Sequence, residues 1–350
     1  MVEAHEHLSA PRRRLRVQLA QVWAGTRPSS TVSWSSVADG PAKCLRAGSP
    51  MRGSGVCWTM IRRRRIGCQN SYLASRLREE DHALTTAPTS TTQSLYVDRV
   101  SRVEVSFSDR GAGRPFMLLH GGAGPQSVSS FADLLAEMQS VRVITPVHPG
   151  FGGTRRPEAL NSIRGVAALY VALLDQIGLS NVTVIGNSIG GWICAEMALC
   201  RSPRISSIVL VDAVGIEVPG HPVADFFALT MDQVAELSYH DPDSFRIDVS
   251  KLPPAQQQAM AGNRAALAVY GGMPSMVDPA LRERLKAVSV RALVLWGESD
   301  RIVDPDYGRA YARAIPTARF RLLEGTGHVP QLETPELLLE AIREFADPAR

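Results

Sequence analysis

Residues 182–192 read VTVIGNSIGGW and hold the strongest local signal in the chain. The first four residues form a short apolar, β-branched run typical of a buried strand, and a good helix-forming segment follows the glycines. A G-x-S-x-G pattern at such a strand-to-helix junction is typical of a nucleophile elbow, a sharp turn that projects its serine from the sheet. The glycines are needed because a Cβ in so tight a turn would collide with neighbouring backbone. The alternative is a glycine-rich turn without catalytic meaning.

Strands and helices alternate on both sides of this turn, which predicts βαβ units and a mainly parallel, doubly wound α/β sheet of about eight strands. The first two strands are expected to pair antiparallel. Residues 214–288 break the alternation with short helical pieces, and we interpret them as a helical cap inserted over one end of the sheet. Strands are predicted at 95–100, 103–108, 115–120, 141–147, 181–186, 205–212, 292–296 and 319–323, and helices at 129–138, 163–177, 189–200, 306–315 and 335–345.

Charge is unevenly spread over the 350 residues, although the composition, with 45% hydrophobic and 21% charged residues, is ordinary for a globular protein. Residues 1–95 hold 14 basic and 6 acidic side chains, a net of +8, whereas residues 96–350 hold 24 and 28, a net of −4. The basic character therefore belongs to the first quarter, and we expect no nucleic-acid partner. No run approaches the roughly 18 apolar residues of a membrane span, so no membrane partner is expected.

Residues 1–94 are predicted to be a poorly ordered basic extension ahead of one catalytic domain at 95–350. They contain arginine runs, show no sustained helical or strand periodicity, and end in a threonine-rich stretch. We favour an upstream stretch without a function of its own; a basic binding tail and a targeting peptide are the alternatives. The five cysteines form no C-x-x-C pair and no export signal is visible, so a reducing, cytoplasmic location is expected.

A second glycine-rich signal, HGGAG at 120–124, follows the apolar strand PFMLL. Such a loop can offer a bare backbone N–H to an anionic oxygen. Gly122 is the expected donor, paired with the N–H of Ile189, the residue after the serine. The alternative, a phosphate-binding loop, fits poorly because the spacing matches neither common nucleotide-binding pattern. His120 is interpreted as a hydrogen-bonded histidine that orients the loop.

Candidates for an acid and a base follow the last two strands. Asp300 lies just past the strand LVLWG, where its carboxyl can reach a histidine above the sheet. Asp304 and Asp212 compete with it, since Asp304 precedes a proline and can equally cap a helix, and Asp212 ends its own strand. In sites built on a nucleophile elbow, the base follows the acid along the chain. His328, in the sequence GTGH, is the one histidine after Asp300.

Taken in order, HGGAG, GNSIGG, WGESD and GTGHVPQLETPE resemble the α/β-hydrolase fold superfamily, in its capped serine hydrolase branch. The resemblance covers about residues 95–350. It implies that Ser188 is the nucleophile, His328 the general base and Asp300 the acid that orients the base. It also implies a small-molecule substrate and a reaction that needs no metal and no organic cofactor.

The resemblance leaves the substrate open. Asn187 before the serine is similar to the carbon–carbon bond hydrolases of ring-cleaved aromatic diketo acids, but these usually carry an aromatic residue after the histidine, where this chain has Val329. We therefore expect a carboxylic-ester hydrolase, with the carbon–carbon hydrolase as the alternative and a ligand receptor on the same fold as a further one. His148, in HPGFG, is interpreted as structural. The candidates for lining an apolar substrate pocket are Trp192, Phe226, Phe227, Tyr239 and Tyr270. The alternative, favoured for most of them, is that they hold the cap helices together.

Overall fold

The computed structural model describes residues 90–97, 102–273 and 275–347. An eight-stranded sheet organises this part of the chain, in the order β1-β2-β4-β3-β5-β6-β7-β8. β2 pairs antiparallel with β1 and β4, and every later pair of neighbours is parallel. The strands are β1 (Ser90–Val97), β2 (Val103–Gly111), β3 (Arg114–Leu119), β4 (Val141–Pro146), β5 (Val182–Asn187), β6 (Ile205–Val211), β7 (Arg291–Gly297) and β8 (Ala318–Leu323).

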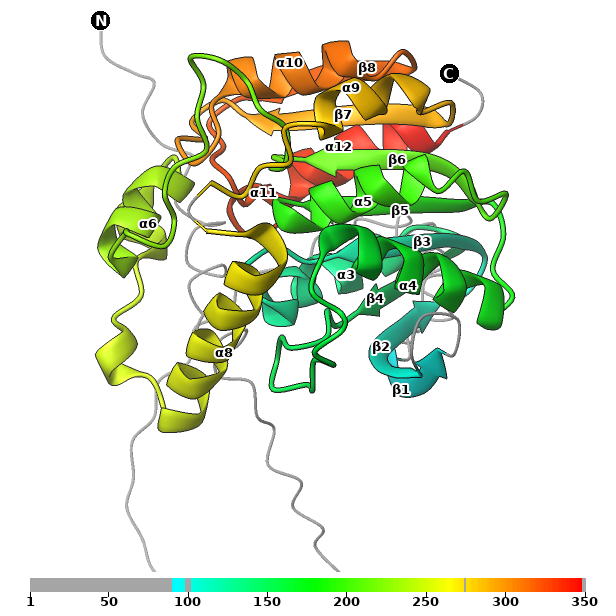
Figure 1. The fold of residues 1–350 in the computed structure, drawn as a ribbon, viewed down its shortest axis with the longest axis horizontal. Coiled ribbons are helices and arrows are strands. Elements are labelled where there is room, and N and C mark those ends of the chain that lie inside the picture. The colour runs from blue at the N-terminus through cyan, green and yellow to red at the C-terminus, as the bar shows by residue number, and fades with distance from the viewer. Residues whose placement is uncertain (1–89, 98–101, 274, 348–350) are drawn as a thin grey trace, which may run out of the picture. The chain divides into compact units, whose positions relative to one another are not determined.

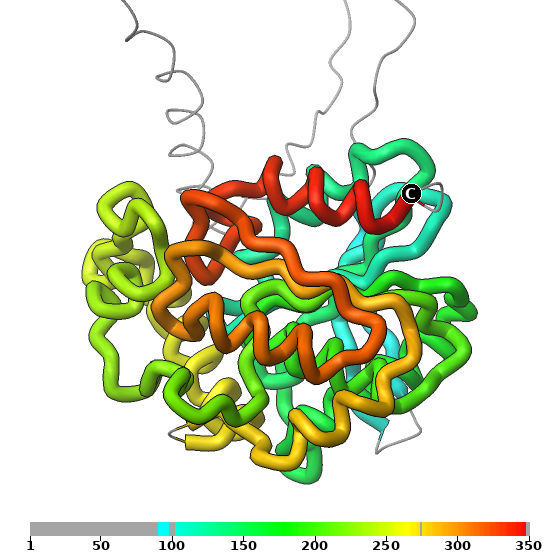
Figure 2. Tube along the Cα trace, turned by 90° about the horizontal axis from the view of Figure 1, so that it is seen from above, coloured from blue at the N-terminus to red at the C-terminus, as the bar shows by residue number. Residues whose placement is uncertain are grey.

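Helices cover both faces of this sheet, which confirms the predicted α/β architecture (Figures 1 and 2). In β3, Phe116 and Leu118 join the core beneath one pair of helices, while Met117 and Leu119 join the core on the opposite face. Continuous apolar runs of this kind are expected where a parallel strand is buried on both faces. One face carries α3 (Ser129–Ala136) and α12 (Pro335–Ala346), and the other carries α4 (Ile163–Gln176), α5 (Ile189–Leu199) and α10 (Pro305–Ala314).

The sheet begins at Ser90, five residues before the predicted start of the catalytic domain at residue 95. Residues 90–94, assigned above to the irregular extension, belong to β1 and pair with β2 from Ser90 opposite Arg110 to Ser94 opposite Ser106. They are exposed, so ladder hydrogen bonds and not burial hold them in the sheet, and no hydrophobic alternation marks them in the sequence. The arginine runs, the first three cysteines and the rest of the extension lie outside the described residues.

The segment between β6 and β7 is helical. Its helices are α6 (Met231–Ser238), α7 (Pro242–Phe245), α8 (Pro254–Gly271) and α9 (Leu281–Arg284). Thr230 and Gln233 form a capping box that starts α6, each side chain accepting the backbone N–H of the other residue. Figure 1 shows α6 and α8 beside the carboxyl ends of the central strands. The strand ends that carry the predicted site residues therefore face this helical segment.

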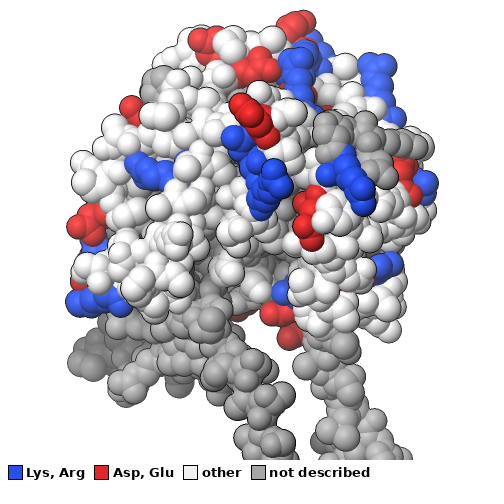
Figure 3. All heavy atoms as spheres, turned by 60° about the horizontal axis from the view of Figure 1, so that its bottom comes forward, with Lys and Arg blue, Asp and Glu red and all other residues white. Residues whose placement is uncertain are grey.

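Charged side chains of both signs are interspersed on the face drawn in Figure 3. The described part of this face shows no broad field of a single sign. No helix in the described part of the chain is long and apolar enough to span a membrane.

Candidate active site

Ser188 occupies the turn between β5 and α5 with φ 57° and ψ −119°, a conformation that non-glycine residues rarely adopt. The turn closes tightly because its neighbours are glycines. A Cβ on Gly186 would come within 2.1 Å of the backbone oxygen of Gly190, and one on Gly190 within 2.5 Å of the backbone oxygen of His120. The sequence GNSIGG thus places the hydroxyl of Ser188 at the end of a central strand.

Three predicted site residues from distant parts of the chain meet here. His328 Nε2 lies 3.0 Å from Ser188 Oγ, and His328 Nδ1 lies 2.8 Å from Asp300 Oδ2. The Asp300 side chain has no exposed surface and that of His328 is 8% exposed. Asp300 Oδ1 also accepts hydrogen bonds from the N–H groups of Ile302 and Val303, at 2.9 and 3.1 Å, which fixes the carboxylate plane.

The two competing aspartates have other partners. Asp304 caps α10 by accepting the N–H of Tyr307 at 2.9 Å, and it also lies 2.7 Å from Nδ1 of His221. Asp212 follows β6, is fully buried, and accepts the N–H of Gly297 at 2.7 Å. Of the three candidates, Asp300 is the one bonded to His328.

His120 and His148 form a separate buried pair. The backbone N–H of His148 donates to His120 Nε2 at 3.1 Å, and His148 Nε2 donates to the backbone oxygen of His120 at 2.9 Å. The Tyr170 hydroxyl lies 2.6 Å from His148 Nδ1. Burial lowers the pKa of His120 from 6.5 to about 4, and burial together with His120 lowers the pKa of His148 well below 6.5. Both rings are therefore neutral at pH 7. Their hydrogen bonds connect the loop after β3, which carries His120, to the loop after β4, which carries His148.

The expected oxyanion donors lie on either side of Ser188. Ile189 is the first residue of α5, and its N–H is one of the four that a helix leaves without an intrahelical partner. Gly122 lies in the wall of the cavity that contains Ser188. The loop that carries Gly122 is held by Asn263 of α8, which donates to the Ala123 oxygen at 3.2 Å and accepts the Gly152 N–H at 2.8 Å.

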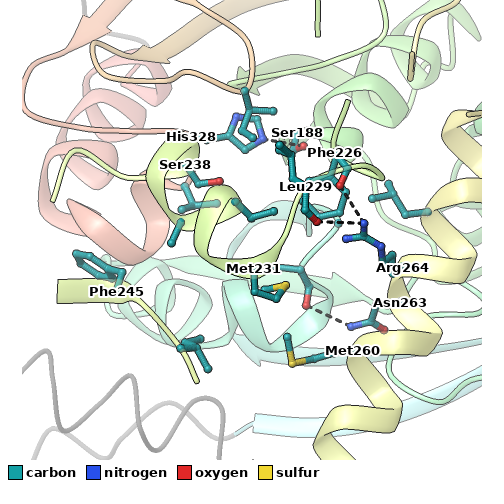
Figure 4. Close-up of a pocket in the computed structure, with 18 of the residues that line it drawn as sticks. Ser188, Phe226, Leu229, Met231, Ser238, Phe245, Met260, Asn263, Arg264 and His328 are labelled. Carbon is teal, nitrogen blue, oxygen red and sulfur yellow. Dashed lines mark hydrogen bonds between the residues drawn. The ribbon is translucent and has the colours of Figure 1, made fainter. Parts of the chain in front are cut away.

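A cavity of about 470 Å³ opens beside Ser188 and His328, and most of its wall comes from the helical segment between β6 and β7. Figure 4 shows Met231, Phe245 and Met260 around it, at a distance from the Ser188–His328 pair. The wall is predominantly apolar, so a bound group would exchange water for hydrocarbon contacts. Apolar lining residues include Phe226, Leu229, Met231, Val234, Met260 and Leu267.

Arg264 is the one lysine or arginine among the described residues of this wall. Its guanidinium donates to the backbone oxygens of Phe226 and Phe227, at 3.1 and 2.7 Å, and to that of Leu229 at 3.5 Å. Figure 4 shows the Arg264 side chain turned toward the backbone oxygens of Phe226 and Leu229. The group also lies over the rings of Phe226 and Phe227. Arg264 therefore holds the chain ahead of α6.

Of the five side chains expected in the pocket, Phe226 and Tyr239 line the cavity, whereas Trp192, Phe227 and Tyr270 lie outside its wall. The sequence marks such residues as aromatic but does not tell core from cavity wall. Phe245 lines the cavity as well, and its ring stacks on Tyr239 with centroids 4.6 Å apart.

The three aromatic residues outside the cavity wall, Trp192, Phe227 and Tyr270, pack within the fold. Trp192 is 5% exposed, and its ring fills the space beside Gly215, where a Cβ would meet it at 2.5 Å. The Tyr270 hydroxyl donates to the Pro149 oxygen at 2.9 Å. Phe227 packs on the main core beneath Arg264. Gly215 has φ 117°, which favours glycine and lets the indole approach the backbone.

Glu333 was not singled out in the sequence, yet it joins the histidine loop to the end of α6. Its Oε1 accepts the N–H groups of His240 and Asp241, at 2.9 and 3.0 Å, and its Oε2 accepts the N–H of Gly327 at 2.7 Å. Asn263 was also missed. The signal in its case is an asparagine inside a long helix, where it is a poor helix former and needs another reason to be present.

Among the described residues, no group of three or more His, Cys, Asp or Glu side chains is placed to hold a metal ion. A sequence model of the alpha/beta hydrolase family matches residues 116–341, more than half of the chain. The chain belongs to the alpha/beta hydrolase family. That match contains Ser188, Asp300 and His328 and the whole segment between β6 and β7.

Dienoate hydrolases and lipases are among the proteins similar to this chain. The chain is 26% identical over 269 residues to a 2-hydroxy-6-oxo-2,4-heptadienoate hydrolase of Pseudomonas putida, covering 69% of this chain and 92% of the relative. It is also 26% identical over 249 residues to Lipase 1 of Psychrobacter immobilis, covering 67% and 75%. Among solved structures, a meta-cleavage product hydrolase from Pseudomonas fluorescens is 20% identical with a TM-score of 0.60, covering 74% of this chain and 98% of that one.

Proposed function

We propose that this member of the family is a serine hydrolase that cleaves uncharged carboxylic esters of small molecules through an acyl-enzyme. The observation that carries the proposal is the chain of contacts from Ser188 Oγ through His328 to Asp300, at 3.0 and 2.8 Å, opening on an apolar cavity. A serine hydroxyl is a weak nucleophile at its free pKa and needs an adjacent base. This geometry supplies one within hydrogen-bond reach.

The first half of the reaction transfers the acyl group. His328 Nε2 accepts the proton of Ser188 as Oγ attacks the ester carbonyl carbon, and the electron pair of the C=O bond moves to oxygen. Asp300 stabilises the imidazolium through its bond to Nδ1 and keeps the ring in the productive tautomer. When the tetrahedral adduct collapses, the bond to the alkoxy group breaks and His328 returns the proton to the leaving oxygen.

The negative oxygen of the adduct needs donors that are already in place. The N–H groups of Gly122 and Ile189 are the proposed pair, and the N-terminal end of α5 adds its positive dipole end. Removing one such donor costs about 10²–10³ in rate in enzymes of this kind. A water then attacks the acyl-enzyme with His328 again as base, which releases the acid and restores Ser188.

The cavity favours a neutral substrate. Its wall has one arginine, Arg264, whose hydrogen bonds go to backbone oxygens of the chain itself. All three of these hydrogen bonds come from Nη2 of Arg264. A carboxylate in this otherwise apolar wall would lose its hydration and meet a single guanidinium that is already partly engaged, which favours a neutral group. An alkyl or aryl group would instead bury its surface at about 25 cal/mol per Å².

The carbon–carbon bond hydrolase is the second candidate. The names of several relatives and the asparagine before the serine favour it. Its substrates are carboxylic acids, so this candidate requires Arg264 to bind a carboxylate, either through N–H groups other than those of Nη2 or by leaving its backbone partners. A ligand receptor without turnover is the third candidate.

The test is turnover of p-nitrophenyl acetate, p-nitrophenyl butyrate and the p-nitrophenyl monoester of succinic acid by wild type and by Ser188→Ala. We expect the neutral esters to be preferred over the charged one, and Ser188→Ala to lose about 10⁴-fold or more in kcat. Equal, inert behaviour of wild type and variant with every ester would favour the receptor. Turnover of a 2-hydroxy-6-oxo-dienoate with no ester turnover would favour the carbon–carbon hydrolase.

A further inference from the structure

A second carboxyl group lies buried behind the Asp300 of the proposed relay. Asp212 follows β6, has no exposed surface, and has φ 47°, a left-handed conformation that aspartate and asparagine tolerate better than most residues. Its backbone N–H donates to the Leu295 oxygen of β7 at 3.0 Å. The side chain is thereby held against the turn that leads from β7 to Asp300.

The hydrogen bonds of this carboxyl group are incomplete. Oδ1 of Asp212 accepts the N–H of Gly297 at 2.7 Å, whereas Oδ2 has no N–H or O–H donor among the described residues. Gly297 joins the two aspartates, because its N–H donates to Asp212 Oδ1 and its backbone oxygen accepts the Asp300 N–H at 3.3 Å. The two carboxyl groups are thereby close enough to influence each other directly. Two ionised carboxylates accept only, so an ionised pair would leave Oδ2 of Asp212 without a donor and would bring two negative charges together in a dry site.

One proton shared between the two groups gives the unpaired oxygen a hydrogen bond and removes one of the two charges. The number of N–H groups that donate to each carboxyl group indicates which of them carries the proton. Asp300 accepts three N–H groups, those of Ile302, Val303 and the His328 ring, whereas Asp212 accepts one. Hydrogen bonds from N–H groups stabilise the charged form, so Asp300 is the better carboxylate. Burial first, and then the charges of Asp300 and Glu333, raise the pKa of Asp212 well above its ordinary value.

We propose that Asp212 is a positioning residue that keeps its proton at neutral pH and donates an O–H···O hydrogen bond to the Asp300 carboxylate. The inference rests on the proposed function in giving Asp300 the role of orienting acid. Asp212 contacts neither substrate nor His328 in this scheme. It adds a fourth donor to Asp300, which spreads the carboxylate charge and fixes the oxygen that faces the histidine ring.

The first arm of the test is the pH profile of kcat/KM for p-nitrophenyl butyrate in wild type, Asp212→Asn and Asp212→Ala. Asp306→Asn is the matched control, because Asp306 is exposed and its ion-pair partner Arg309 is exposed as well. An asparagine amide donates as the protonated acid does, so Asp212→Asn should keep the midpoint of the acidic limb and retain more activity than Asp212→Ala. Loss of the donor in Asp212→Ala concentrates charge on Asp300 and makes the imidazolium easier to form. Its acidic limb should move upward, on the order of half to one pH unit.

The second arm does not need turnover. The infrared difference spectrum of wild type minus Asp212→Asn at pH 7 should show the C=O stretch of a protonated, buried carboxylic acid that shifts in D₂O, and the Asp306→Asn difference should lack it. Absence of that band overturns the inference, whether or not any ester is cleaved. An acidic limb that moves downward in Asp212→Asn also overturns it, since this is the effect of removing a negative charge. Equal thermal destabilisation of both variants with unmoved limbs would reduce Asp212 to a packing role and would likewise overturn it.

Discussion

The side-chain amide of Asn187 donates a hydrogen bond to the backbone oxygen of His328, with Nδ2 and O 2.9 Å apart. Its other end is held as well, because Gln331 Nε2 donates to Asn187 Oδ1 at 3.1 Å. The residue before the serine therefore fixes the loop that carries the histidine. This contact gives Asn187 a structural reason to be present that holds for ester and carbon–carbon hydrolysis alike.

Asn187→Ala should lower both stability and kcat. The substitution leaves the buried His328 oxygen and Gln331 amide without a partner, a loss of about 1–3 kcal/mol. Urea unfolding measures the first effect and turnover of p-nitrophenyl butyrate the second. Gln176→Ala is the matched control, since it removes an exposed amide-to-backbone bond, from Gln176 to the Tyr96 oxygen. If both variants lost stability equally and neither lost activity, the proposed link would be wrong.

Asp300→Asn should reduce kcat/KM far more than Asp304→Asn. Asp300 is buried and bonded to His328, and an amide there imposes the wrong ring tautomer, which costs about 10⁴-fold in comparable sites. Asp304 caps α10, a position where asparagine is equally suitable. Steady-state kinetics of the two variants with one neutral ester compares them directly. The reverse order would assign the acid to Asp304.

Two glycine-to-alanine changes should have opposite effects on stability. A Cβ on Gly327 would lie 2.2 Å from the backbone oxygen of Ser238, the oxygen that accepts the His328 N–H at 2.7 Å. Gly327→Ala must therefore displace the histidine loop or α6, and we expect lower thermal stability and lower turnover. Gly262 lies exposed inside α8 with nothing within 4 Å of its Cβ position. Gly262→Ala should raise the free energy of unfolding by about 1 kcal/mol.

The sequence predicted the sheet well because its strands are buried on both faces and leave unbroken apolar runs. The meeting of Ser188, His328 and Asp300 could also be predicted, since each lies in a short motif at a strand end. Residues 90–94 could not be predicted as a strand, because an exposed edge strand is held by the neighbouring strand and shows no hydrophobic alternation.

The surroundings of the site depended on contacts that only folding creates. Trp192 and Phe226 look alike in the sequence, but one fills the core beside Gly215 and the other lines the cavity. Asn263 and Glu333 act on backbone groups far away in the chain. Nothing local distinguishes Glu333 from an ordinary polar residue of a helix, and the one local sign for Asn263 is its place inside a long helix.

The buried pair His120 and His148 predicts a loss of stability at mildly acidic pH. Burial lowers the pKa of His120 to about 4, while an unfolded histidine titrates near 6.5. The unfolded chain therefore binds more protons between these values, so the stabilisation is complete above pH 6.5 and is lost as the pH falls toward 4. For His120 alone the loss by pH 5 is about 2 kcal/mol, and His148 acts in the same direction.

His120→Asn should remove this part of the pH dependence. Urea unfolding of wild type and variant at pH 8, where both histidines are neutral in folded and unfolded chains, gives the cost of the substitution itself. At pH 5 the difference in unfolding free energy between the two proteins should be smaller by about 2 kcal/mol, because only wild type has the His120 imidazole to protonate on unfolding. A difference that stays constant from pH 8 to pH 5 would mean that His120 is not held neutral by the fold.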